Sequence, residues 1–173
     1  MSPAPKLFAA YVGGMITGGN IELHDMRFVI GQRIQDTYGA LRSQWWGIPE
    51  SLHLDCWAEL DHADGYFITL KREPSEGALK LYYVNVGGYG EGQFTELHEN
   101  IFVVAPSEHK AKVRALKKVK HWGAFHQDEI YEAEQCFDLN DIAGQQQWFV
   151  HLTEGAPEGL PPVTCQYLRI GKR

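Results

Sequence analysis

Apolar and polar positions repeat along this chain at an offset of 74 residues. The segment KLFAAYVGG at 6–14 returns as KLYYVNVGG at 80–88, and ELHD at 22–25 returns as ELHE at 96–99. Self-similarity at one fixed offset indicates a tandem duplication, and a duplicated unit usually folds into two similar halves. The pattern therefore predicts two related modules.

The predicted modules, residues 1–76 and 77–173, form one compact unit about a pseudo-twofold axis. β-Branched and aromatic runs bounded by turn residues predict strands. The expected strands are 7–12, 22–30, 53–60 and 66–70 in the first module, and 81–86, 96–104, 126–136, 148–152 and 163–170 in the second. Apolar spacings of three and four residues predict one main helix in each module. The expected class is α+β: tandem modules of antiparallel sheet, each a β-β-α-β-β repeat followed by a final strand, which can also be written β-α-β-β-β.

Several side chains have an expected direction. The first helix has its buried stripe at Ile34, Tyr38, Leu41 and Trp45, and the second, capped by Ser107, at Val113, Leu116 and Val119. In the strand at 53–60, alternation places Leu54, Cys56, Ala58 and Leu60 on one face and His53, Asp55, Trp57 and Glu59 on the other. Gly13 and Gly14 are expected in a connecting loop, where glycine readily adopts positive φ.

Composition restricts the class of protein. The chain has 173 residues, 44% of them hydrophobic, and no apolar run near the roughly 20 residues that cross a bilayer. The N-terminus lacks signal-peptide features, so a cytoplasmic location is expected. A net charge of −6 argues against nucleic-acid binding, and the cations at 110–120 are interpreted as a solvated helix surface. Three cysteines without a CxxC pair argue against a disulfide framework and are interpreted as small buried residues.

Four histidines occupy matched places with carboxylates nearby. His24 matches His98, and we pair His53 with His126. Residues two apart on a strand point to the same face, so each Glu-x-His or His-x-Asp pair can present two ligands to one ion. The candidate ligand-binding residues are Glu22, His24, His53, Asp55, Trp57, Glu96, His98, His126 and Asp128, with His24, His53, His98 and His126 as metal ligands. Imidazole with carboxylate suits a divalent transition metal such as Zn, Mn, Fe or Ni.

Other interpretations of these pairs remain open. The same side chains can satisfy backbone groups of the glycine loops, or act as acid and base in an enzyme. A non-catalytic protein that binds a partner through its surface or its basic helix is a further hypothesis. The expected partners are a small-molecule ligand and a second copy of the chain, without membrane or nucleic acid. Whether the protein is an enzyme stays undecided at this point.

The residues of the first module also resemble a known family. The stretches that carry the likeness are the paired-glycine strand, GGNIELHD at 18–25, Phe28-Val29, ALR at 40–42 with WWG at 45–47, and LHLD at 52–55. They resemble the bacterial domain of unknown function 1543, here in two tandem copies. The second copy departs from the first where Asp25 becomes Glu99 and Leu54 becomes Gln127. The resemblance implies no particular activity, and a further likeness of the β-α-β-β-β order to vicinal-oxygen-chelate enzymes is one of topology only.

Overall fold

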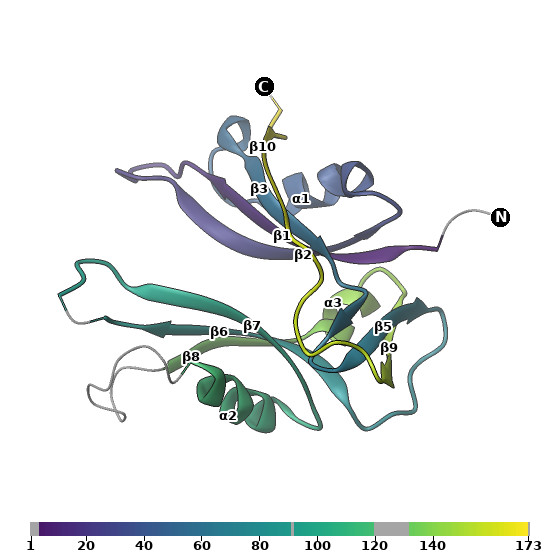
Figure 1. Ribbon diagram of the computed structural model, residues 1–173. Coiled ribbons are helices and arrows are strands. Elements are labelled where there is room, and N and C mark those ends of the chain that lie inside the picture. Colours follow the sequence, from purple (N-terminus) through teal and green to yellow (C-terminus); the bar gives the residue numbers. More distant parts are fainter. Residues whose placement is uncertain (1–3, 91, 120–131, 173) are drawn as a thin grey trace.

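The computed structural model describes residues 4–90, 92–119 and 132–172 and has an α+β fold (Figure 1). Its strands are β1 (Lys6–Gly14), β2 (Leu23–Gly31), β3 (His53–Glu59), β4 (His62–Ala63), β5 (Tyr66–Lys71), β6 (Lys80–Gly88), β7 (Leu97–Ala105), β8 (Glu132–Asp138), β9 (Phe149–Glu154) and β10 (Thr164–Arg169). Its helices are α1 (Tyr38–Gln44), α2 (Glu108–Lys118) and α3 (Leu139–Gly144), with short 3₁₀ turns η1 (Ile34–Thr37) and η2 (Pro49–Ser51). The predicted class is confirmed.

Two antiparallel sheets face one another. One has the strand order β10-β3-β1-β2 and the other β7-β6-β8, while the third sheet, β4-β5-β9, lies with α3 at one end of the space between them (Figure 1). Helix α1 covers the outer face of the first sheet and α2 the outer face of the second (Figure 1). Strands from the C-terminal part of the chain complete sheets that begin in the N-terminal part. Strand β10 pairs with β3 in the first sheet, and β9 pairs with β5 in the third.

The two hairpins repeat at the predicted offset. Lys6 pairs with Gly31 in β1 and β2, and Lys80 pairs with Ala105 in β6 and β7. The pairing with the next strand is irregular at the same place in both sheets. The register of β1 with β3 shifts after Tyr11, and the register of β6 with β8 shifts after Asn85. A β-bulge re-aims the side chains that follow it, and it is retained in related strands as a feature of the fold.

The core between the sheets joins the modules. Leu7 and Phe28 from the first sheet pack with Leu81 and Phe102 from the second, and all four are at most 6% exposed. Burying side chains of this size stabilises the folded state by about 1.5–3 kcal/mol each. Separate clusters fill the space under α1 and under α2. The apolar core therefore fixes how the two sheets sit against each other.

Some local expectations are wrong. The α2 helix buries Ala111 and Ala115, whereas Val113 is 37% exposed, so its buried stripe starts two residues earlier than predicted. Alternation along β3 fails at the bulge: Leu54 belongs to the core under α1 and Leu60 to the core between the sheets. Helix α3 was not expected at all. The strand predicted at 126–136 is described as β8 from Glu132, and its first part lies outside the described residues.

The basic helix is largely used within the fold. The carboxylate of Asp64 is 1% exposed, and it contacts Lys118 Nζ at 2.8 Å and Arg114 Nη2 at 2.9 Å. Lys112 pairs with Glu108 one turn earlier. These ion pairs tie α2 to the turn between β4 and β5. In the described part of the chain, none of the helices has the length and apolar character that spanning a bilayer requires.

Candidate metal centre

The candidate centre is built around Gly13 on the inner face of the first sheet. In the sheet register Gly13 lies opposite His24 of β2 and opposite His53 of β3. A Cβ atom on Gly13 would lie 2.6 Å from His24 Cδ2 and 2.7 Å from His53 Nε2, closer than Cβ contacts normally occur. Glycine is therefore required here for space. The expectation that Gly13 serves a loop with positive φ is wrong, because it is a strand residue and is not among the positive-φ glycines.

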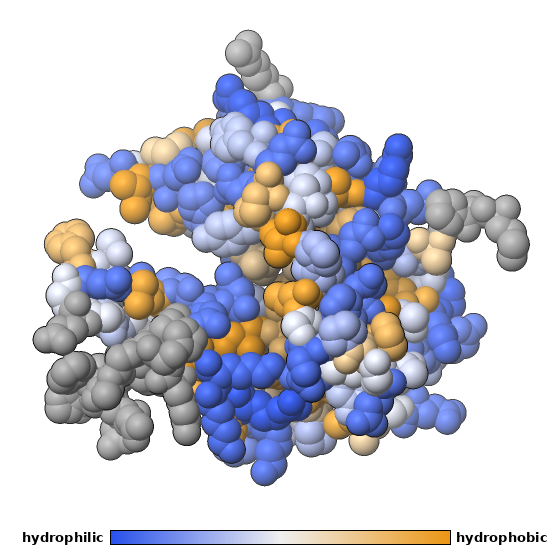
Figure 2. Space-filling view, in the orientation of Figure 1, coloured by the Kyte–Doolittle hydropathy of each residue, from blue (hydrophilic) through white to orange (hydrophobic). Residues whose placement is uncertain are grey.

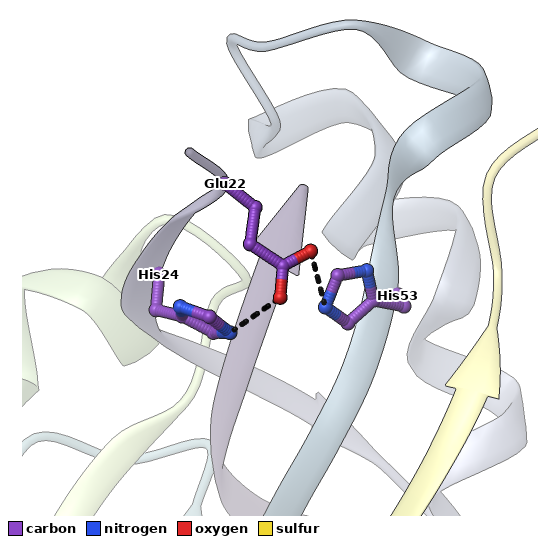
Figure 3. Close-up of side chains that lie close together, drawn as sticks. All are labelled: Glu22, His24 and His53. Atoms are coloured by element: carbon purple, nitrogen blue, oxygen red, sulfur yellow. Dashed lines mark ion pairs between the residues drawn. The ribbon is translucent and has the colours of Figure 1, made fainter. Parts of the chain in front are cut away.

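Glu22 completes the group by reaching between the two imidazoles, as Figure 3 shows. Its Oε1 lies 3.6 Å from His24 Nε2 and its Oε2 lies 3.8 Å from His53 Nε2. The three ligand atoms that could bind an ion all lie within 4.8 Å of one another. Ligands about 2.1 Å from a tetrahedral ion are about 3.4 Å apart. The cluster is thus close to the dimensions of a metal site before any ion is added.

Asp55 is a fourth donor, two residues along β3 from His53. Its Oδ2 lies 3.1 Å from His24 Nε2 and 3.5 Å from His53 Nε2. The register shift between Tyr11 and Val12 leaves Asp55 without a cross-strand partner in β1. Residues two apart on a strand point to the same face, so Asp55 shares the inner face of the sheet with His53, as the alternation predicts.

Two buried atoms of the centre have no hydrogen-bond partner among the described residues. They are His53 Nε2 and Asp55 Oδ2. The other ring nitrogen of His53, Nδ1, lies 3.0 Å from the carbonyl oxygen of Ser51, so it carries the proton and donates. Nε2 of the neutral ring then offers a lone pair. A backbone carbonyl that fixes the tautomer in this way is the usual outer partner of a metal-binding histidine.

Neighbouring aromatic rings hold the two histidines in place. The ring of Tyr11 stacks on His24 with centroids 5.2 Å apart, and the ring of Tyr167 from β10 lies 4.7 Å from that of His53. Burial, followed by the negative charge of Asp55, raises the pKa of the Tyr11 hydroxyl. Tyr11 is thus neutral near pH 7 and acts as a packing surface and hydrogen-bonding group.

A cavity of about 460 Å³ lies between the sheets beside His24. It is lined by Tyr11, His24, Asp25 and Met26 from the first sheet and by Tyr83, Asn85, His98, Asn100, Gln135 and Phe137 from the second. Figure 2 shows the surface hollowed between these two parts of the molecule. Amide, imidazole and hydroxyl groups dominate this lining, so the space suits a polar ligand.

The second module forms a different arrangement. His98 Nε2 lies 3.5 Å from Glu96 Oε2, as predicted for a Glu-x-His pair, and its Nδ1 lies 3.1 Å from Asn85 Oδ1. Opposite Gly87, however, the register places Glu132, at the strand position that His53 occupies opposite Gly13. His126 and Asp128 lie outside the described residues. Across the described ranges, the one group of three that could hold a metal is Glu22, His24 and His53.

Trp57 is not brought to the centre. Its side chain packs against the core under α1, on the opposite face of the first sheet from His53. The residues that sequence reasoning missed are Gly13, Ser51 and Tyr167. The doubled glycine at the end of the repeated strand was the available signal for Gly13, since glycine inside a strand often marks a close approach of other groups. Tyr167 gave no signal, because its place depends on a strand far away in the sequence.

The fold and the cluster together define a class: two packed antiparallel sheets with a histidine and carboxylate group on one inner face. Residues 19–70 match the family described as Domain of Unknown Function (DUF1543). It is also similar to the crystal structure of a protein Il1583 from Idiomarina loihiensis, with 31% identity over 98% of this chain and 99% of that chain and a TM-score of 0.71. No curated protein matches the chain.

Proposed function

We propose that the protein binds one divalent transition metal through Glu22, His24 and His53, with Asp55 as the fourth ligand, and that a small polar molecule reaches the metal from the cavity between the sheets. The observation that carries this proposal is that two buried atoms, His53 Nε2 and Asp55 Oδ2, lie 3.5 Å apart and make no hydrogen bond to any described residue. Buried polar atoms are nearly always satisfied, and leaving one unsatisfied costs about 1–3 kcal/mol. A cation between them would satisfy both atoms.

Charge supports the same conclusion. Glu22 and Asp55 bring two carboxylates to the same two imidazoles, within 3.1–3.8 Å. A cation bound at the same place would be attracted by both carboxylates. A divalent ion with two carboxylates and two neutral imidazoles gives a site without net charge. Nitrogen and oxygen donors in this ratio favour Zn, Mn, Fe or Ni over Ca or Mg.

The second candidate is an enzyme that uses this metal. It is favoured by the position of the cavity, because His24 belongs both to the metal cluster and to the cavity wall. A catalytic metal needs a coordination position that faces the substrate, and the cavity would supply that access. Glu22, which is 48% exposed, is the ligand best placed to leave the metal when a substrate binds.

The wider description is part of the same proposal. Residues 77–173 are a second copy of the family module, supported by the identical hairpin register, and the protein is a cytoplasmic one of bacterial type. The expected partners are the small ligand of the cavity and a second copy of the chain. The second module supplies one wall of the cavity through Asn85 and Asn100.

Metal analysis tests the proposal most directly. Protein purified without added metal or a His-tag should contain one transition-metal ion per chain, and His53→Ala should abolish it. The matched control is His98→Ala in the second module, which should leave the metal in place. At 100 times the dissociation constant, metal should stabilise the folded state by about 2.7 kcal/mol, or raise Tm by about 5–11 °C for a chain of this size. Metal-free protein whose Tm does not respond to Zn, Mn, Fe or Ni would overturn the proposal.

A further inference from the structure

Cys56 and Cys165 lie side by side on neighbouring strands, next to Asp55. They are direct partners in the antiparallel pairing of β3 with β10, and their Sγ atoms are 3.0 Å apart. Direct partners in such a pair have Cα atoms about 4.5–5.5 Å apart, which lies within the span of a disulfide. The two sulfurs can therefore be joined without moving the backbone.

The strand that carries Cys165 is held on both sides of it. Before Cys165, Thr164 pairs with Trp57 of β3. After it, the amides of Ile170 and Gly171 both donate to the carbonyl oxygen of Leu52. An anchored strand keeps the two thiols close, and such proximity favours their reaction with each other over reaction with other molecules.

The two thiols differ in access. Cys165 is exposed, whereas Cys56 is only partly so. Cys165 is therefore the thiol that an oxidant meets first, and Cys56 is the partner held beside it.

We propose that Cys56 and Cys165 form a reversible disulfide when hydrogen peroxide oxidises the protein. The thiolate of Cys165 attacks the peroxide O–O bond, giving a sulfenic acid and releasing hydroxide, which takes up the thiol proton as water. The sulfur of Cys56 then attacks that of Cys165. The S–S bond forms, the S–O bond breaks, and the hydroxyl leaves with the Cys56 proton as a second water. Two thiols are oxidised by two electrons, and one peroxide is reduced to two waters.

The new bond would lie two residues before Tyr167, whose ring packs on His53 of the candidate centre. Between Cys165 and Leu168 the register shifts, so that Gln166 and Tyr167 together oppose the single residue Asp55. Tyr167 lies on His53 in this bulge. The disulfide fixes the segment of β10 that carries Tyr167, so oxidation links the redox state of the protein to access to His53.

The test uses reduced, chelator-treated protein, so its outcome does not depend on metal binding. After hydrogen peroxide treatment near pH 7, the free thiols should fall from three to one, the mass should fall by two hydrogen atoms, and peptide mapping should join Cys56 to Cys165. Dithiothreitol should restore all three thiols. In the matched control Cys136→Ser the same bond should form, whereas Cys56→Ser should stop at a sulfenic acid on Cys165 that dimedone traps. Wild-type protein that keeps three thiols, forms only disulfides between chains, or links Cys136 would overturn the proposal.

Discussion

Replacing Gly13 with alanine tests whether His24 and His53 act as one centre. The added Cβ would lie 2.7 Å from His24 Nε2 and 2.7 Å from His53 Nε2, whereas ordinary contacts begin at 3.4 Å. The rings must therefore give way by about 0.7 Å, and metal ligands tolerate displacements of only about 0.2 Å. We expect Gly13→Ala to weaken metal binding at least 10–100-fold, the effect usually seen when support of a ligand is lost.

The same change has a smaller effect on stability. Overpacking a filled position costs about 1–3 kcal/mol, and replacing glycine by alanine inside a strand returns about 0.5–1 kcal/mol of that cost. The net destabilisation should be roughly 0–2.5 kcal/mol, which urea unfolding of the metal-free protein measures. The protein should therefore stay folded while it loses the metal.

The matched control for this variant is Gly39→Ala in α1. A Cβ at Gly39 meets nothing within 4 Å, so that variant should bind metal normally and be stabilised by about 0.5–1 kcal/mol. Calorimetric titration with Zn²⁺ of the wild type and both variants gives the comparison. If folded Gly13→Ala protein binds Zn²⁺ as tightly as the wild type, the two imidazoles do not share an ion and the assignment is wrong.

Three further changes probe the supports of the fold and of the centre. Asp64→Ala removes the acceptor 2.7 Å from the Val104 amide and should lower the free energy of unfolding by about 1–3 kcal/mol in urea titrations. Asp64→Asn keeps an acceptor and suits the φ of 52°, so it should lower that free energy less. Equal losses in the two variants would contradict this. Burial raises the pKa of Cys136 from 9.0 to about 11, so the folded state holds this thiol proton more tightly than the unfolded state does. The free energy of unfolding should therefore fall as pH rises from about 9 toward 11, and thermal melts of Cys136→Ala should show a smaller fall. Tyr167→Ala should speed removal of metal by a chelator because it uncovers His53, while Tyr167→Phe should not; identical chelation rates would contradict this.

Periodicity was enough to predict the repeated hairpin. The apolar run of β1 recurs in β6 at the offset of 74, and both strands are almost wholly buried, as such runs predict. The Glu-x-His spacing likewise placed Glu22 beside His24 correctly. Both features depend on residues close together in the sequence, where strand geometry alone decides direction.

What the sequence could not provide is the contribution of distant segments. The bulge in β3 breaks the alternation that the pattern of 53–60 suggested: Asp55 keeps the face of His53 as predicted, but Trp57 packs on the opposite face, against the core under α1. A bulge depends on pairing with β1, which the local sequence does not encode. In the same way the pairing of β10 with β3 could not be predicted, since it joins Cys165 to a residue 109 positions earlier.

The two sheets share the same hairpin register but carry different side chains at matching places. In the first, the position opposite Gly13 is His53, and Tyr11 beside it presents a ring to His24. In the second, the register places Glu132 opposite Gly87, and the residue at the place of Tyr11 is Asn85.

Asn85 takes part in a chain of hydrogen bonds instead of a ring stack. Its amide donates to Asn100 Oδ1, which also accepts from the Tyr83 hydroxyl, while its own Oδ1 lies 3.1 Å from His98 Nδ1. These side chains face the cavity across from His24. One inner face thus has the dimensions of a metal site, and the other has fixed amide and hydroxyl groups. Because the two walls differ, they present unlike groups to the two sides of a molecule lying between them, and this would select a single binding orientation.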